Sequence, residues 1–170
     1  MRAGPPSLET VDEISLDLPI APGAELLQRV PLFRTLGFTE TLELSGICHL
    51  ERKPDGTVII EQDSLGQALY LLKEGSATVR RRDPESGAQL DLATLGRGEL
   101  FGEMSLIDDH LASAEVVASG SVELVVIPRK KFETLLAGND RLAVKVYRCF
   151  CTALSDRLRR ANQRLSEAGR

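Results

Sequence analysis

A glycine-rich stretch that contains the carboxylate of Glu103 is the segment of this sequence best suited to chemistry. It reads Leu-Gly-Arg-Gly-Glu-Leu-Phe-Gly-Glu-Met-Ser-Leu over residues 95–106. A short helix that opens at Gly102 presents unpaired backbone N–H groups, and with the helix dipole these favour an anion. Gly102 also allows a ligand to approach the backbone closely. The candidate binding residues of this segment are Phe101, Gly102, Glu103, Met104, Ser105 and Leu106.

Other kinds of chemistry find little support in the sequence. Its two histidines, His49 and His110, are far apart and form no metal-binding pattern, and no P-loop or nucleophile motif is present. Cys149 and Cys151 are two residues apart on an expected helix, so their side chains diverge by about 200°. We expect one of these thiols to be buried and the other partly exposed. The sequence therefore predicts a non-enzymatic protein with no metal and no resident cofactor.

The elements that must hold the glycine-rich stretch alternate between helical and strand-like patterns. Between His49 and Pro128 the β-prone runs are 58–60, 68–72, 77–79, 90–95, 116–117 and 122–127. Turn-forming residues separate these runs, which favours an antiparallel sandwich or barrel. A helix is expected before them, at 38–48, and a shorter one at 24–29. Pro128 and Gly138 bracket a further helix, and Asn139 or Asp140 caps a longer one that runs to about Ser166.

Composition and charge limit the possible partners and compartment. The chain has 170 residues, of which 42% are hydrophobic, and a net charge of −4, which gives no general attraction to nucleic acid or to an anionic membrane. No apolar run is long enough to span a bilayer. Residues 1–23 contain four prolines and no apolar stretch, so we expect a tail and no signal peptide. These features predict a cytoplasmic protein with no membrane partner.

The order of elements and the stretch at 95–106 resemble the cyclic-nucleotide-binding domain family, which includes bacterial catabolite-activator proteins and the regulatory subunits of kinases. The resemblance covers about residues 25–165 and is supported by Glu61-Gln62-Asp63 and Lys73-Glu74-Gly75. It implies a mainly β fold with α: an eight-stranded antiparallel double-stranded β-helix (jelly-roll, cupin-like) barrel. N-terminal helices, a short phosphate-cassette helix and two C-terminal helices complete that fold. It also implies that Glu103 accepts hydrogen bonds from a ribose hydroxyl.

The sequence departs from the family at the residue that anchors the phosphate. In the family, a Pro-Arg-Ser/Ala-Ala run follows the cassette, and its arginine pairs with the cyclic phosphate. Here Leu111 and Ala112 occupy the first two positions, while Ser113 and Ala114 keep the pattern, so Ala112, Ser113 and Ala114 complete the candidate site. Losing one partner of a buried charged pair costs about 2–5 kcal/mol, or roughly thirty- to several-thousand-fold in affinity. A second departure is Gln62, where the family usually has glycine.

The C-terminal helix is the expected route by which the domain acts. Ala143, Tyr147, Phe150, Leu154, Leu158, Ala161 and Leu165 trace one stripe with spacings 4, 3, 4, 4, 3 and 4. This period favours a short contact between two helices over an extended coiled coil, and the alternative is that the stripe packs only on its own barrel. The arginines at 157, 159, 160, 164 and 170 are interpreted as a solvated basic end. No DNA-binding domain is expected.

Two functions remain open from the sequence. The first is a degenerate cyclic-nucleotide-binding domain, with lost or weakened binding, that acts through a protein partner or through assembly. The second is a working receptor for cAMP, cGMP or another small ligand, whose C-terminal helices move on binding. The expected organisation is a tail at 1–23, the barrel domain with its flanking helices at 24–138, and a long helix at 139–170 that serves as a lid or a homodimer contact.

Overall fold

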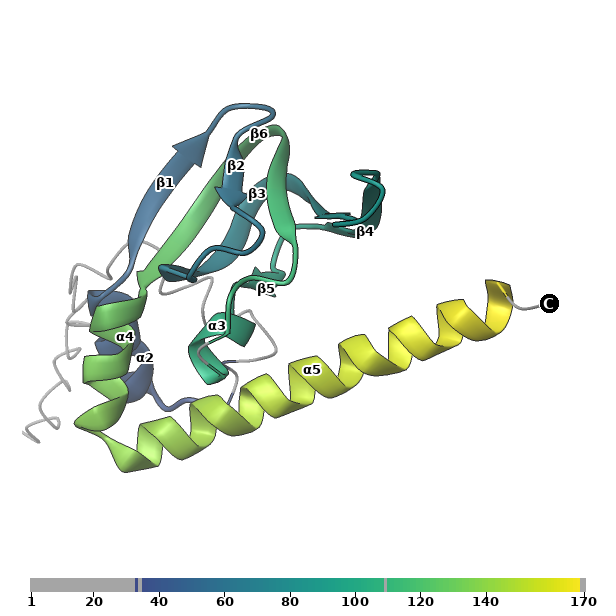
Figure 1. Cartoon of the computed structure of the whole chain (residues 1–170). Helices are drawn as coiled ribbons and strands as arrows, with labels where there is room; N and C mark the ends of the chain where they lie inside the picture. Colours follow the sequence, from purple (N-terminus) through teal and green to yellow (C-terminus); the bar gives the residue numbers. More distant parts are fainter. Residues whose placement is uncertain (1–32, 34, 109, 169–170) are drawn as a thin grey trace, which may run out of the picture.

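The computed structural model describes residues 33, 35–108 and 110–168, and the helix expected at 24–29 lies outside them. In chain order the elements are α2 (Phe38–Gly46), β1 (His49–Lys53), β2 (Val58–Ile60), β3 (Ala68–Arg82), β4 (Gln89–Leu95), β5 (Leu100–Phe101), α3 (Met104–Ile107), β6 (Glu115–Pro128), α4 (Arg129–Ala137) and α5 (Asp140–Ala168). Helices α2, α4 and the start of α5 gather at one end of the sheet, and α3 lies between the sheet and α5 (Figure 1).

All the strands belong to one antiparallel sheet. Its main path is β1-β6-β3-β4, with β2 paired to β6 and β5 paired to β3. The described residues form six strands, whereas the family resemblance implied eight. The difference arises because β3 and β6 each run through a turn signal that was expected to end a strand. At Gly75 and Gly120 the backbone has positive φ, 87° and 79°, and the β3–β6 register shifts between Leu72 and Ser76 without breaking the pairing.

Two hydrophobic clusters lie on opposite faces of the sheet because side chains alternate along β3 and β6. The inner cluster, on the face of the sheet away from α4 and α5, comprises Ala68, Leu72, Ala77, Leu95, Phe101, Val116, Ala118, Val122, Leu124 and Val126. The outer cluster joins Leu69, Leu71, Val125 and Ile127 to the helices. The start of β6 alternates in the same way: Val116 lies in the inner cluster, while Glu115 is half-buried outside it.

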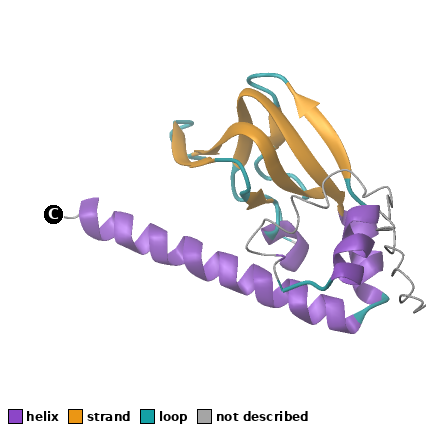
Figure 2. Cartoon of the chain, turned by 180° about the vertical axis from the view of Figure 1, so that it is seen from behind, coloured by secondary structure: helices purple, strands orange, loops and turns teal. Residues whose placement is uncertain are grey.

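Helices α4 and α5 begin where the sequence predicted them. Pro128 precedes α4, whose Phe132 and Leu136 are buried, and Gly138 ends it. The side chain of Asn139 caps α5 by accepting a hydrogen bond from the N–H of Leu142 at 3.0 Å. Helix α5 then continues for 29 residues, and its C-terminal end extends beyond the sheet in both views (Figures 1 and 2).

The single apolar stripe predicted along α5 is in fact two stripes. One faces the outer cluster and holds Leu142, Val146, Cys149, Phe150 and Ala153. The other faces away from the sheet and holds Val144, Tyr147, Cys151, Leu154, Leu158, Ala161 and Leu165. Two residues of the predicted single stripe, Ala143 and Phe150, belong to the first of these. Ala143 packs against the outer cluster, and the Phe150 side chain is completely buried there and contacts the Phe132 ring. The prediction of one buried and one exposed thiol is confirmed, since Cys149 is buried and Cys151 exposed.

Candidate functional site

The glycine-rich stretch forms β5, a tight turn and α3. Gly102 has φ of 85°, a conformation that L side chains rarely adopt, and a Cβ at this position would lie 2.8 Å from the carbonyl oxygen of Ala68. The rings of Phe101 and Tyr70 stack beside this turn, with centroids 5.3 Å apart. Glycine is therefore required here by both backbone conformation and space, and the turn is held against β3.

Glu103 is the charged residue at the centre of this turn, and its side chain is only 2% exposed. Arg157 of α5 donates hydrogen bonds to the Glu103 carboxylate and to the carbonyl oxygen of Leu100. Burial raises the pKa of Glu103 above its ordinary value, and the nearby Arg157 charge acts in the opposite direction. The carboxylate expected to receive a ribose hydroxyl thus already has a partner from the C-terminal helix.

The segment that holds Ala112 is tied to the turn after β2. Ala112 is 9% exposed, and its N–H and carbonyl bond to the carbonyl of Ser64 and the N–H of Asp63, each at 2.8 Å. The left-handed residue of that turn is Asp63, with φ of 62°, and not Gln62. Gln62 instead bonds the backbone of Arg82 on β3. The position expected to carry the phosphate anchor is therefore built into the cassette, but it presents a methyl group.

A cavity of about 420 Å³ opens beside the cassette. Its lining residues are Val58, Ile59, Ile60, Glu61, Ser64, Leu65, Gly66, Gln67, Tyr70 and Glu115. Two of these residues are acidic, and no Lys or Arg is among them. Arg80, the cation closest to Glu115, is bound to its carboxylate at 3.1 Å. The lining supplies apolar surface and hydrogen-bonding groups but no positive charge for a phosphate.

The structure brings together most of the residues that the sequence proposed. Phe101, Glu103 and Ser105 are buried around the turn, Leu106 is half-buried, and a Cβ on Gly66 would lie 2.6 Å from Cβ of Ser105. By contrast, Met104 is 48% exposed and Ser113 is also exposed, while Ala114 is half-buried.

Two basic residues of this site were not identified from the sequence. Arg157 was assigned to a solvated basic end, yet it reaches a buried carboxylate 54 residues earlier in the chain. Arg129 of α4 was not singled out at all, and it donates a hydrogen bond to the carbonyl of Ser105 at 3.0 Å, which ties α3 to α4. No spacing signal links either arginine to the cassette, so only the fold reveals them.

Among the described residues, no group of three or more His, Cys, Asp or Glu side chains is placed to hold a metal ion. Within the same residues, no helix combines the length and apolar character needed to cross a membrane.

Comparison with known proteins identifies the family. Residues 50–139 match the model of the "Cyclic nucleotide-binding domain". The cyclic AMP receptor protein of Thermus thermophilus is 40% identical over 108 residues, which cover 62% of this chain and 49% of that protein. The chain spans less than half of each curated relative compared, down to 16% for a Drosophila melanogaster cGMP-dependent protein kinase. This chain belongs to the cyclic nucleotide-binding domain family.

Solved structures agree with this assignment. A cyclic nucleotide-binding domain from Methylobacillus flagellatus has a TM-score of 0.73 and 28% identity, and the match covers 83% of this chain and 79% of that one. The regulatory subunit of a cAMP-independent protein kinase A from Trypanosoma brucei has a TM-score of 0.65 and 27% identity, covering 84% and 46%. A triple mutant of that subunit, with one new arginine, is bound to cAMP in its A site; it has a TM-score of 0.63 and 25% identity, covering 78% and 50%.

Proposed function

We propose that this domain is a non-catalytic regulatory module whose binding of cyclic nucleotides is lost or greatly weakened and which acts through protein contacts of α5. The observation that carries the proposal is the buried methyl group of Ala112 at the position where the family places its phosphate-binding arginine. A cyclic phosphate keeps its negative charge at neutral pH, so a site that binds it needs a compensating cation or several aligned donors.

The electrostatics of the neighbouring cavity support this proposal. Glu61 and Glu115 line it, and Arg80 is already paired with Glu115. A phosphate entering the cavity would meet these two carboxylates, and it would meet no Lys or Arg of the lining. Two effects therefore act in the same direction: the favourable charge is absent, and unfavourable charges are present.

A relative offers a parallel for the proposed loss and for its reversal. The Trypanosoma brucei regulatory subunit is described as part of a cAMP-independent kinase, and its mutant with a new arginine is bound to cAMP. By analogy, the fold of this chain would be retained while its ligand preference has changed, and Ala112→Arg would be the simplest way to restore cAMP binding.

The second function, a working receptor, is favoured by one specific observation. Arg157 contacts Glu103, so a guanidinium already lies at the cassette. If a ligand hydroxyl replaced Arg157 on the Glu103 carboxylate, the released guanidinium would be available to a phosphate. In this alternative, α5 would report binding because the residue that is displaced belongs to it.

The proposed route of action in either case is the outward stripe of α5. Its residues, from Val144 to Leu165, follow spacings of 3, 4, 3, 4, 3 and 4, which is a strict heptad pattern. Leu158 and Leu165 are 63% and 72% exposed. This outward stripe is called the seam below. An apolar heptad seam that is exposed to water in the monomer is typical of a helix that pairs with another helix. We therefore extend the expected short contact to a coiled-coil pair with a second copy or a partner helix.

Isothermal titration with cAMP and with cGMP tests the proposal. The parent protein should show no binding in the micromolar range, and Ala112→Arg should gain at least thirtyfold in affinity. Leu111→Arg is the matched control because it adds the same charge at an exposed neighbouring position and should gain nothing. Thermal unfolding of each variant verifies that it is folded. Micromolar binding by the parent would instead support the receptor, and Arg157→Gln would then abolish that binding.

A further inference from the structure

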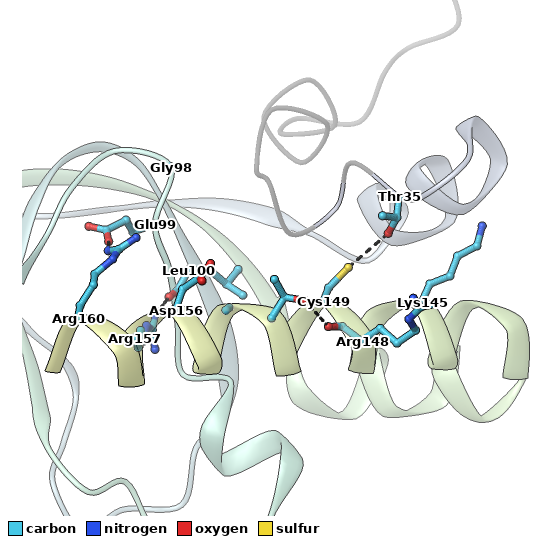
Figure 3. A pocket seen from close by; sticks show the side chains of 12 residues that line it. Thr35, Gly98, Glu99, Leu100, Lys145, Arg148, Cys149, Asp156, Arg157 and Arg160 are labelled. Carbon is cyan, nitrogen blue, oxygen red and sulfur yellow. Dashed lines mark hydrogen bonds and ion pairs between the residues drawn. The ribbon is translucent and has the colours of Figure 1, made fainter. Parts of the chain in front are cut away.

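A second cavity, larger than the one beside the cassette, lies on the α5 side of the glycine-rich stretch. Its volume is about 500 Å³, and it is enclosed by one face of α5, by the turn before β5 and by Thr35 (Figure 3). The α5 residues in its wall are Lys145, Arg148, Cys149, Thr152, Ala153, Asp156, Arg157 and Arg160. Cavities of roughly 300–1,000 Å³ with a mainly apolar wall and a few convergent polar groups are typical small-molecule sites.

The charged groups around this cavity leave an excess of positive charge. Four basic and two acidic side chains, Glu99 and Asp156, line it. Both oxygens of Glu40 bind Lys145, at 2.8 and 2.6 Å, and Asp156 is bound by Arg159 at 2.6 Å. Arg160 extends from α5 toward Glu99, but the closest N–O distance is 3.8 Å, longer than a normal hydrogen bond (Figure 3).

Arg148 is the cation of this wall that remains available. Its guanidinium has no ion-pair partner among residues 33, 35–108 and 110–168. It lies one turn from Thr152, another residue of the wall, whose hydroxyl donates a hydrogen bond to the Arg148 carbonyl at 3.0 Å. Leu100, Cys149 and Ala153 supply an apolar floor between Arg148 and Arg160. An available guanidinium beside an apolar floor matches a ligand with an anionic head and an apolar body.

We propose that the cavity between α5 and the β4–β5 turn is a binding site for a small amphipathic organic anion, with Arg148 binding the anionic group and the Leu100–Ala153 floor holding the apolar part. The site is separate from the cassette cavity, and its wall shares no residue with the lining of that cavity. Arg157 belongs to this wall and also bonds Glu103, so the two sites are neighbours joined through one side chain.

The test uses the full chain and two dyes that differ in charge. The first, 8-anilinonaphthalene-1-sulfonate, carries a sulfonate on an aromatic body, and the second, N-phenyl-1-naphthylamine, has the same aromatic body without the charge. Fluorescence titration should show one sulfonate-dye site per chain. Arg148→Gln should weaken the sulfonate dye about five- to tenfold and leave the neutral dye unchanged. Arg141→Gln removes the same charge from an exposed position of α5 outside the cavity and should change neither affinity.

A second variant tests the cavity rather than the charge. Thr152 is an exposed residue of α5, so the fold should tolerate Thr152→Phe. The phenyl ring would occupy the cavity and should abolish binding of both dyes. The proposal is overturned if the parent binds no sulfonate dye, if Arg148→Gln binds it as tightly as the parent, or if Thr152→Phe retains it. None of these measurements involves a cyclic nucleotide, so their failure is distinct from failure of the proposed function.

Discussion

The guanidinium of Arg157 on α5 is hydrogen-bonded to the buried carboxylate of Glu103 at the start of α3. Arg157 also bonds the carbonyl of Leu100, so one side chain joins the C-terminal helix to both sides of the glycine turn. Any change in ligand occupancy that moves Glu103 must therefore change the contacts of α5. This is a direct physical link between the cassette and the helix that carries the exposed seam.

Arg157→Gln should destabilise the protein by about 1–3 kcal/mol, because it leaves the Glu103 carboxylate buried without its cation. The double variant Glu103→Gln/Arg157→Gln should recover part of that loss, since it removes the buried charge as well. Urea unfolding at pH 7 measures both. A double variant no more stable than Arg157→Gln alone would show that the pair does not act as a unit.

The same variant has a predicted pH dependence. Burial raises the pKa of Glu103, and without Arg157 nothing on α5 opposes the shift. A carboxyl with a raised folded-state pKa contributes to the free energy of unfolding while it is protonated, at pH values below its unfolded pKa. That contribution is lost as the pH rises through the folded-state pKa, because the buried carboxyl then ionises. The stability difference between parent and Arg157→Gln should thus be larger at pH 7.5 than at about pH 4.5. An equal difference at both pH values would contradict this account.

The contact between α2 and α5 should show the opposite sign. Hydrogen bonds from Lys145 and from the N–H of Gly37 hold the pKa of Glu40 below its ordinary value. Its contribution is therefore present at neutral pH and is lost as pH falls through the depressed pKa. Glu40→Gln should cost about 1 kcal/mol at pH 7 and much less at pH 3, measured by denaturant unfolding. Glu74→Gln, at an exposed position of β3, is the control.

Substitutions at Gly75 and Gly120 separate the stability cost of a positive φ from the stability cost of a steric clash. Both have positive φ, but a Cβ on Gly75 would lie 2.6 Å from the carbonyl of Ser121, whereas on Gly120 it would meet nothing within 4 Å. Gly120→Ala should cost about 1 kcal/mol, the strain of φ alone, and Gly75→Ala clearly more, because β3 and β6 must also move apart. Equal losses in thermal unfolding would show that the close approach of these strands relaxes freely.

Much of this architecture was predictable because it rests on local signals. Proline and glycine bracket α4, Asn139 caps α5, and the alternation along β6 separates Val116 from Glu115. The strand count failed where a turn signal was ambiguous: Gly75 and Gly120 are typical of turns, but opposite one another they bend two paired strands without ending them.

The parts of the site that sequence reasoning missed depend on tertiary placement. On α5, Phe150 and Leu158 both fit one helical period, and only packing shows that the first faces the core and the second faces water. An arginine such as Arg157 near the end of a polar helix has the pattern of a solvated charge. Its buried partner lies in a distant turn, and no local pattern encodes that pairing.

The separation of the two stripes changes how dimerisation must be tested. Phe150→Glu, the variant that the single-stripe prediction favours, would place a charge in the core and unfold the protein. Leu158→Lys instead alters the exposed seam, and it should convert a dimer of the 18.6 kDa chain into a monomer by light scattering. Gln163→Lys adds the same charge off the seam and should leave the mass unchanged. A parent protein that is monomeric at high micromolar concentration would contradict self-pairing and leave a partner helix as the occupant.

Cys151 reports the orientation of the two helices in such a dimer. It occupies a seam position, and in a parallel, in-register pair each seam residue faces its own copy across the two-fold axis. Mild oxidation should therefore yield a disulfide-linked dimer on a non-reducing gel, and Cys151→Ser should abolish it. Cys149 is buried, and burial raises the pKa of Cys48 to about 12, so neither thiol should substitute. A dimer by light scattering that does not cross-link would indicate antiparallel helices. Cys151 lies three to four residues before the centre of the seam, so in an antiparallel pair the two thiols would be about 10 Å apart along the axis, too far for a disulfide.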